Sequence, residues 1–394
     1  MNSCKSDEEN DKTSGSISSN NSDLKRMPPP IRTLKRKKEL EEKLNEEFDV
    51  EAMEELEDIM CFRNWKQANA QSADAFARDM SDLGEVHSMR RKYLKNHQMN
   101  KYLEKLKGGD FRTLWIAILA CLNNLLLAYM WSKQASAFHM KQSILYFGSI
   151  TLVGGSIQGI MGVIIHDAGH NLVSEKAWIN KLVLCISNIP LLIPLSFSFK
   201  RYHFMHHVYQ GIDGKDPDLP LKWEIKLIRG RWWAKVFWLA IYPIVYLFRG
   251  LSLKKKPSLV ELWNWLFILT SNFILYLIIG WRGLKFLLSS AWFGYSFHPA
   301  AAHFIQEHYT FVDGQETYSY YGPLNLIFMN IGYHNEHHDL AGIPWSRLPF
   351  ISALVPGMYR KLSCHKSWPK VHWDFITKRN MGPVSRVIRA NKYH

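Results

Sequence analysis

Residues 330–344 read NIGYHNEHHDLAGIP, and this stretch places three histidines within five positions. They are His334, His337 and His338, at spacings i, i+3 and i+4. Side chains three and four residues apart lie on one face of a helix. Imidazole is a good ligand for iron, zinc and copper. The stretch therefore predicts a short helix that presents metal ligands on one side.

Two further stretches, HDAGH and HFMHH, have related spacings, and with HNEHH they form the three histidine boxes. Their histidines are His166, His170, His203, His206 and His207. Eight box histidines exceed what one ion needs, so the pattern favours two metals. His308 is a candidate ninth ligand and His303 a weaker candidate. Six others are expected to be surface or structural residues: His87, His97, His139, His365, His372 and His394.

The bulk composition favours a membrane partner. Net charge is +14 and the pI about 9.4, but no RNA- or DNA-binding motif accompanies this charge. Lys and Arg instead flank the apolar segments, as basic residues do at the cytosolic ends of membrane helices. We therefore expect membrane association and no nucleic acid. The five cysteines are scattered and form no CxxC pair, which argues against a thiolate zinc site or a disulfide framework.

Long apolar segments predict the architecture, because about 20 apolar residues cross a bilayer as a helix. The four candidates are Leu114–Trp131, Ile144–Ile165, Leu262–Trp281 and Leu284 to about His303. Short loops join the first to the second and the third to the fourth. The expected fold is an all-α integral membrane protein with four transmembrane helices in two hairpins and a cytosolic, histidine-rich di-metal cap. Leu182–Phe199 and Val236–Phe248 contain proline and are interpreted as interfacial or re-entrant, with a crossing left open.

The three boxes, HxxxH, HxxHH and HxxHH around helical hairpins, resemble the membrane fatty-acid desaturase and hydroxylase superfamily. Two longer stretches closely resemble sphingolipid Δ4-desaturases, also called dihydroceramide desaturases. These are SFKRYHFMHHVYQGIDGKDPDLP (198–220) and HFIQEHYTFVDGQETYSYYGPLNLIFMNIGYHNEHHDLAGIP (303–344). A pattern in SDLGEVHSMRRKYL is also similar and comprises Asp82, His87, Arg90 and Arg91. One departure is Asp167, which stands where that family usually has Glu.

The resemblance implies a chemistry for the boxes. An unactivated C–H bond has no acidity to exploit, so its cleavage requires a strong oxidant, which a metal cofactor supplies. The expected cofactors are two non-heme irons, with O₂ as co-substrate and electrons from NADH through an external cytochrome b5 and its reductase. No HPGG haem motif is present; the nearest string, 298–301, lacks both glycines. Asp167, Glu336 and Asp339 are the expected catalytic carboxylates, which would orient the ring nitrogens.

The implied reaction converts dihydroceramide to ceramide by a trans C4–C5 double bond, at an endoplasmic reticulum membrane with the active site facing the cytosol. C4 hydroxylation to phytoceramide, or desaturation of another lipid chain, is the alternative. A zinc-dependent membrane hydrolase is disfavoured, because it needs one metal with an open water position. The intact boxes argue against a non-catalytic lipid-binding scaffold.

The domain organisation follows from composition and from the extent of the resemblance. Residues 1–65 are polar and charged, and we expect them to be a disordered extension. Residues 66–110 are expected to form a cytosolic N-terminal region. Residues 111–385 form the expected membrane desaturase domain, and 386–394 a basic C-terminal tail.

Overall fold

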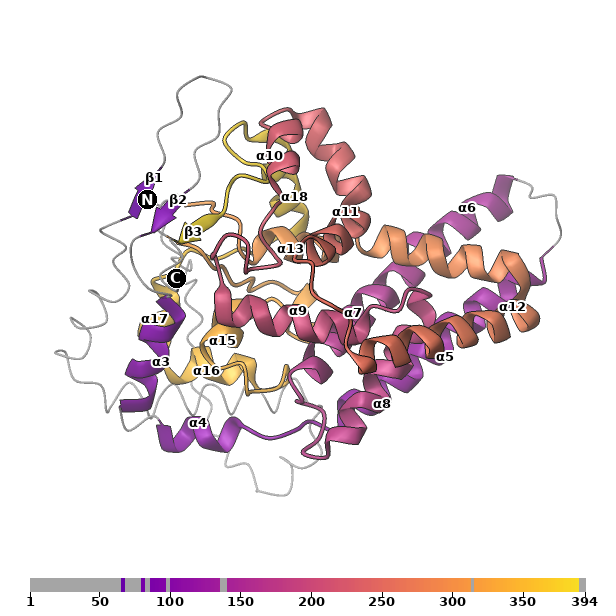
Figure 1. Cartoon of the computed structure of the whole chain (residues 1–394), viewed down its shortest axis with the longest axis horizontal. Coiled ribbons are helices and arrows are strands. Elements are labelled where there is room, and N and C mark those ends of the chain that lie inside the picture. Colours follow the sequence, from indigo (N-terminus) through magenta and orange to yellow (C-terminus); the bar gives the residue numbers. More distant parts are fainter. Residues whose placement is uncertain are drawn as a thin grey trace, which may run out of the picture.

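The computed structural model describes residues 65–67, 79–81, 86–96, 100–134, 140–312 and 315–389. Most of these residues are helical, as expected. Figure 1 shows long helices extending to one end and shorter elements gathered at the other. The predicted extension before residue 65 lies outside the described residues, as do Asp82, His97, His139 and His394.

Four helical segments are long and apolar enough to cross a membrane. They are α5 (Arg112–Ser132), Met140–Gly169, α11 (Trp232–Ser252) and α12 (Leu259–Gly294). The second comprises α6 (Met140–Gly148), the π-helical η2 (Ser149–Gly154) and α7 (Gly155–Gly169). The first two correspond to the first two predicted spans. The others differ from the prediction.

α12 contains the third predicted span and most of the fourth in one 36-residue element. It is broken at Gly280, whose φ of 60° and ψ of −174° are not helical. Figure 1 shows the helix turning back at its far end. A positive φ strains residues with a Cβ, so glycine suits this position. The fourth predicted span also ran too far, because α12 ends at Gly294 and His303 begins the separate helix α13 (His303–Gln306).

α11 is longer than the apolar run that suggested an interfacial segment. It includes Pro243 and extends through Trp232 at one end and Ser252 at the other. Its buried face carries Trp238, whose ring centroid lies 5.5 Å from that of Phe375 on α18 (Trp368–Thr377). Packing against α18 therefore supports a helix longer than its apolar centre alone predicts.

The HFMHH box lies on a helix that follows a sharp bend. α8 (Ala177–Asn188) and η3 (Ile189–Leu191) precede α9 (Ser196–Tyr209), and the two parts meet at 113°. The side chain of Asn188 holds this bend. Its Oδ1 accepts hydrogen bonds from the backbone N–H groups of Leu195 and Ser196, and its Nδ2 donates to Ile193 O. The bend agrees with the re-entrant or interfacial interpretation of this segment.

The remaining helices are short. They are α3 (Val86–Asn96), α4 (Asn100–Leu106), α10 (Lys222–Ile228), η4 (Pro299–Ala302), α14 (Leu324–Ile327), α15 (His334–Asp339), α16 (Leu348–Leu354) and α17 (Pro356–Arg360). A hydrophobic cluster joins α3 and α4 to α16 and α17, with Tyr93, Leu94 and Tyr359 among its buried members. This packing places α3 beside α15, which carries the HNEHH box.

A small sheet is the exception to the all-α prediction. Its strands β1 (Trp65–Gln67), β2 (Asp79–Ser81) and β3 (Val387–Arg389) lie in that order. β1 and β2 are antiparallel, whereas β2 and β3 are parallel. Strands of three residues are too short to show a clear apolar alternation in sequence. The sheet joins two segments that precede α3 to one that follows α18.

Residues predicted as the start of a basic tail lie inside the fold. Arg386 and Arg389 are buried. Arg386 Nη2 lies 2.8 Å from Asp218 Oδ2, and Arg389 Nη2 lies 2.5 and 2.6 Å from the two carboxylate oxygens of Glu316. Arg389 N also donates to Gly211 O at 2.9 Å. These arginines tie the C-terminal strand to the loop that follows the HFMHH box.

Candidate metal centre

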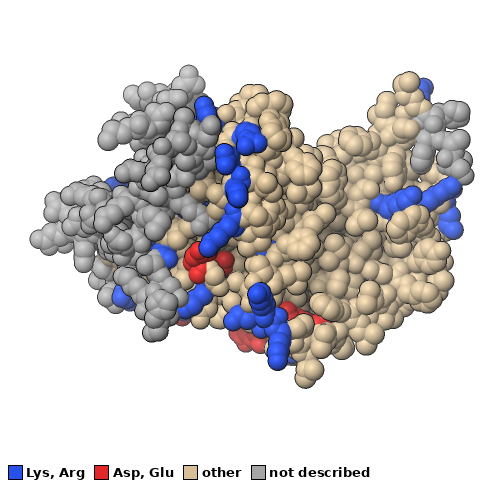
Figure 2. Space-filling view, turned by 45° about the horizontal axis from the view of Figure 1, so that its top comes forward, with Lys and Arg blue, Asp and Glu red and all other residues tan. Residues whose placement is uncertain are grey.

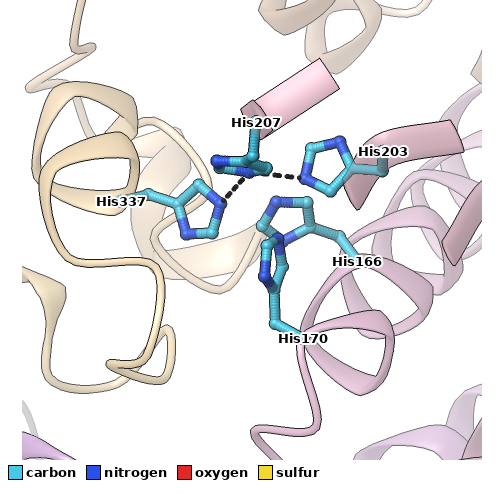
Figure 3. A group of neighbouring side chains, drawn as sticks. All are labelled: His166, His170, His203, His207 and His337. Carbon is cyan, nitrogen blue, oxygen red and sulfur yellow. Dashed lines mark hydrogen bonds between the residues drawn. The ribbon is translucent and has the colours of Figure 1, made fainter. Parts of the chain in front are cut away.

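Five histidines from three helices converge on one point (Figure 3). They are His166 and His170 at the end of α7, His203 and His207 on α9, and His337 on α15. One ring nitrogen from each lies within 4.8 Å of those of the others. His207 Nε2 is 3.0 Å from His203 Nε2 and 3.1 Å from His337 Nε2. We refer to these five residues as the first histidine group.

A second histidine group lies directly beside the first and consists of His206, His308 and His338. His206 Nε2 and His308 Nε2 are 3.0 Å apart. His334 lies at the edge of this group, with its Nε2 2.9 Å from His308 Nε2. The rings of His207 and His338 stack across the two groups with centroids 4.2 Å apart. All nine predicted ligands are therefore brought together.

Helical spacing explains how each HxxHH box contributes to both groups. In α9, His203 and His207 are four residues apart and face the first group, whereas His206 faces the second. In α15 the arrangement is reversed: His334 and His338 lie on the second-group side, and His337 belongs to the first. Around a helix, residues at i and i+4 are about 40° apart, whereas the residue at i+3 is about 100° from that at i+4 and can therefore reach the neighbouring group. The two boxes thus lie between the two groups.

The chemistry of these rings fits bound metal. Several ring nitrogens are buried without a hydrogen-bond partner: Nδ1 and Nε2 of His166, Nε2 of His170, Nδ1 of His334, and Nδ1 and Nε2 of His338. An unsatisfied buried polar atom is costly unless something binds it. Burial, followed by neighbouring histidines, holds the pKa of His337 and His338 well below the ordinary value. The rings are then neutral, which is the form that ligates metal.

Neither histidine group includes a carboxylate among the residues that the structure describes. The side chains that these groups offer to a metal are therefore all imidazoles. Imidazole suits iron, zinc and copper. Two adjacent groups can hold two ions, and single-metal hydrolysis would leave one group unused.

Sequence reasoning missed Asp216, which orients one of the candidate ligands, His206. His206 Nδ1 donates to Asp216 Oδ1 at 2.9 Å, which directs the opposite nitrogen toward the second group. The buried carboxylate also accepts from the backbone N–H groups of Gly211 and Asp218. Such carboxylate partners fix the orientation of a ligating ring. The sequence signal was a glycine-containing, acidic turn directly after the HFMHH box.

Replacement of Asp216 by alanine is expected to lower metal retention and activity about 10–100-fold, because His206 loses the partner that orients it. The matched control is Asp213→Ala, since Asp213 is exposed in the same turn. Metal content of the purified variants, measured by elemental analysis, checks this expectation. Equal retention in both variants would contradict it.

The three predicted catalytic carboxylates are all buried, but they form hydrogen bonds with residues other than the nine candidate ligands. Among the described residues, none of them is hydrogen-bonded to any of the nine histidines. Asp167 Oδ2 accepts from Trp345 N at 3.4 Å, and its Oδ1 lies 3.9 Å from His166 Nδ1. Glu336 accepts from the hydroxyls of Ser319 and Tyr321 at 2.7 and 2.6 Å. Their catalytic roles remain predictions.

Asp339 binds a histidine that the ligand prediction did not include. Its Oδ1 lies 2.6 Å from Nδ1 of His87, and Tyr359 donates to its Oδ2 at 2.9 Å. Burial alone would raise the pKa of Asp339, but Arg90 and His87 outweigh burial and lower it. His87 was expected to be a surface or a structural residue. It is fully buried, which excludes the surface role.

The other expected surface or structural histidines that the structure describes, His365 and His372, lie outside both histidine groups. His303, the weaker candidate ligand, also lies outside them. Its Nδ1 is paired with the backbone oxygen of Ala300 at 2.7 Å, and its Nε2 is 3.9 Å from Glu307 Oε1. The eight box histidines therefore lie in or beside the two groups, and of the described non-box histidines only His308 joins them.

Comparison with known proteins places this site in a family. The family model described as Fatty acid desaturase matches residues 142–368, which is more than half of the chain. This range includes all nine histidines. The chain belongs to the fatty acid desaturase family, and it is an oxidoreductase.

Individual proteins similar to this chain indicate which kind of desaturase it resembles. The sphingolipid delta(4)-desaturase DES1 of Drosophila melanogaster is 36% identical over 313 residues, covering 78% of this chain and 94% of that protein. The human DES1 is 36% identical over 297 residues, with 74% and 88% coverage. The bovine sphingolipid delta(4)-desaturase/C4-monooxygenase DES2 is 36% identical over 311 residues, with 78% and 93% coverage. The resemblance to sphingolipid Δ4-desaturases is confirmed.

Proposed function

We propose that this chain converts dihydroceramide to ceramide by introducing a trans double bond between C4 and C5. The observation that carries the proposal is the pair of adjacent all-nitrogen histidine groups, in a chain whose relatives are named sphingolipid Δ4-desaturases. The reaction removes one hydrogen from each carbon. With O₂ as co-substrate, the balance is two hydrogens from the lipid, two electrons and two protons for each pair of water molecules formed.

Two irons would be held by the two histidine groups. With O₂, bound iron supplies the oxidant that an unactivated C–H bond requires. The protein's part is to hold and orient the rings. α7, α9 and α15 position the ligands, and Asp216 fixes the tautomer and direction of His206. His166, His337 and the second group are buried, whereas His170, His203 and His207 are half-buried. NADH would provide electrons through separate cytochrome b5 reductase and cytochrome b5 proteins.

The site would face the cytosol from an endoplasmic reticulum membrane. The four predicted spans would form two hairpins: α5 with Met140–Gly169, and the two arms of α12. Large apolar side chains on α5 and α12 are exposed, which suits contact with lipid. On the face of the molecule drawn in Figure 2, Lys and Arg gather in separate zones, and a broad, mostly uncharged surface lies between them. A bilayer against that surface would leave the basic residues near the two membrane–water boundaries.

Expression in a host that lacks ceramide desaturation tests the proposal. Mass spectrometry of the host's sphingolipids is expected to show Δ4-trans ceramide only when the chain is expressed. Expression of a chain with His207→Ala is the control, since His207 belongs to the first group. Unsaturation confined to glycerolipid acyl chains would overturn the sphingolipid assignment.

C4 hydroxylation is a second candidate function. It is favoured by a specific observation: the similar bovine and human DES2 proteins are named for both desaturase and C4-monooxygenase activity. Both reactions attack the same part of the lipid. We expect mostly Δ4-trans ceramide, with the 4-hydroxylated lipid at most a minor product. Predominance of 4-hydroxyceramide in the same expression experiment would establish the hydroxylase instead.

Removal of the N-terminal extension is expected to leave the chemistry intact. The residues before about 60 contain no histidine box and no apolar span. A chain starting near Phe62 keeps β1, α3 and all nine histidines. We expect it to retain most of the specific activity in microsomes, assayed with dihydroceramide at equal protein amounts. A truncated chain that is inserted and metal-loaded yet inactive would assign the extension a role in turnover.

A further inference from the structure

A series of close contacts runs from the N-terminal helix α3 to the second histidine group. His87 on α3 is fully buried, and its Nε2 lies 2.8 Å from Thr317 Oγ1. The same hydroxyl lies 3.4 Å from Nδ1 of His308, whose Nε2 belongs to the second group. The desaturase reaction described above gives neither His87 nor Thr317 a role.

The first part of the series fixes the proton on His87. Asp339 is bound by Arg90 Nε at 3.0 and 2.9 Å, so its carboxylate is paired with a permanent charge. A carboxylate 2.6 Å from His87 Nδ1 requires the proton on that nitrogen. Arg90 Nη2 also lies 2.8 Å from Nδ1, but it donates to Asn335 Oδ1 at 3.1 Å. In the neutral form of the ring, His87 Nε2 is then left as an acceptor.

Thr317 connects His87 to His308 through its hydroxyl group. A threonine hydroxyl has one proton and two lone pairs. The proton goes to His87 Nε2, at 2.8 Å. The lone pairs accept from Gln210 Nε2 at 3.3 Å and from His308 Nδ1 at 3.4 Å. His308 therefore keeps its proton on Nδ1 and turns the lone pair of Nε2 toward the second group.

We propose that His87 is a positioning residue of the metal centre: through Thr317 it holds the His308 ring with Nε2 directed at the second histidine group. This role rests on the proposed function, because it requires His308 to bind metal. The N-terminal helix is then a support of the centre as well as a covering element.

Attachment of α3 to the fold does not depend on the His87–Thr317 hydrogen bond. Arg90 binds Asp339, and Arg91 Nη1 donates to the backbone oxygen of His338 at 2.8 Å. Tyr93 and Leu94 are buried in the hydrophobic cluster with α16 and α17. Loss of the single bond to Thr317 should therefore act on the His308 ring more than on the docking of the helix.

Two pairs of variants separate positioning from simple support. Thr317→Val removes the hydroxyl with little change in size, and Thr317→Ser keeps it. His87→Gln places an acceptor oxygen near the former Nε2, whereas His87→Asn reaches Asp339 but not Thr317. His365→Gln is the control, because His365 lies outside both groups. Each variant is purified as the full chain, loaded with ferrous iron and dialysed against a chelator.

Iron per chain, measured by elemental analysis, is the main readout, with the melting temperature in detergent measured in parallel. We expect the second group of Thr317→Val and His87→Asn to hold iron about tenfold less well, so that iron per chain falls toward half of that in the unmodified chain. Retention should stay near that of the unmodified chain in Thr317→Ser, His87→Gln and the control. The double variant His87→Asn with Thr317→Val should be no worse than Thr317→Val alone, because both act through one hydroxyl.

Equal iron retention in Thr317→Val and Thr317→Ser would overturn the proposal. So would a loss in His87→Gln as large as that in His87→Asn, or a drop in melting temperature without loss of iron, since both indicate support of the fold alone. Should the His87 variants fail to fold, the Thr317 pair decides the matter. An unmodified chain that retains no iron would instead reject the proposed function itself.

Discussion

Alanine at any one of the eight box histidines is expected to reduce turnover below roughly 1% of the unmodified activity. Loss of an outer partner of a ligand already costs 10–100-fold, and loss of the ligand itself should cost more. The eight positions are His166, His170, His203, His206, His207, His334, His337 and His338. Ceramide formation in microsomes and iron content of the purified variants are the measurements. Both should fall together.

The histidine control is His365→Ala, which removes a half-buried imidazole outside both groups. It should keep its iron and most of its activity. Expression and membrane insertion must be equal across the series, because a buried side chain also contributes to packing. Substantial activity in three or more of the eight variants would reject a centre held by these histidines.

Electron supply is expected to produce the second large effect. The purified chain should give no product with NADH alone, because its sequence contains neither an HPGG haem motif nor a GxGxxG nucleotide fingerprint. Addition of cytochrome b5 and its reductase should raise product formation from background to sustained turnover, because the reaction then has its reductant. Mass spectrometry of the ceramide product measures it.

The controls for this experiment omit one protein at a time. Reductase without cytochrome b5, and cytochrome b5 without reductase, should both leave the chain inactive. NADH-driven turnover by the single chain would show that it carries a redox group of its own. That result would contradict the use of an external donor.

The sequence predicts which box histidines cluster, because their spacing reflects local geometry. Positions i, i+3 and i+4 share a helix face regardless of the rest of the fold. Division of the ligands between two groups is a tertiary property. His206 and His207 are neighbours in sequence yet belong to different groups, because consecutive residues of α9 point about 100° apart around the helix. The boxes alone do not reveal which histidine faces which group.

Contacts between distant segments account for most of what sequence reasoning missed. His87 and Asp339 are 252 residues apart, and only the packing of α3 against α15 brings them together. Asp216 lies only 10 residues from His206, but the carboxylate reaches the ring because the intervening turn folds back. The β-sheet pairs β2 with β3, about 300 residues later in the chain, which local propensity cannot indicate.

The helix boundaries show a different limitation. The apolar runs of α12 indicated two separate spans, and the change of direction lies at Gly280, within a residue of where the third predicted span ends. Apolar composition locates such segments but does not specify whether the backbone breaks between them. For α11, the apolar centre was visible, but its full length depends on packing against α18.

The most direct test of the central claim is the fate of hydrogen at C4 and C5 of the lipid. Dihydroceramide carrying deuterium at C4, or in a separate sample at C5, is supplied to membranes that contain the chain, cytochrome b5 and its reductase. We predict a Δ4-trans ceramide that has lost one hydrogen from each carbon, with slower turnover of the C4-labelled substrate if that hydrogen is removed first. A product that keeps all hydrogen at C5 and gains a hydroxyl at C4, or no change in the sphingoid chain, would contradict the account.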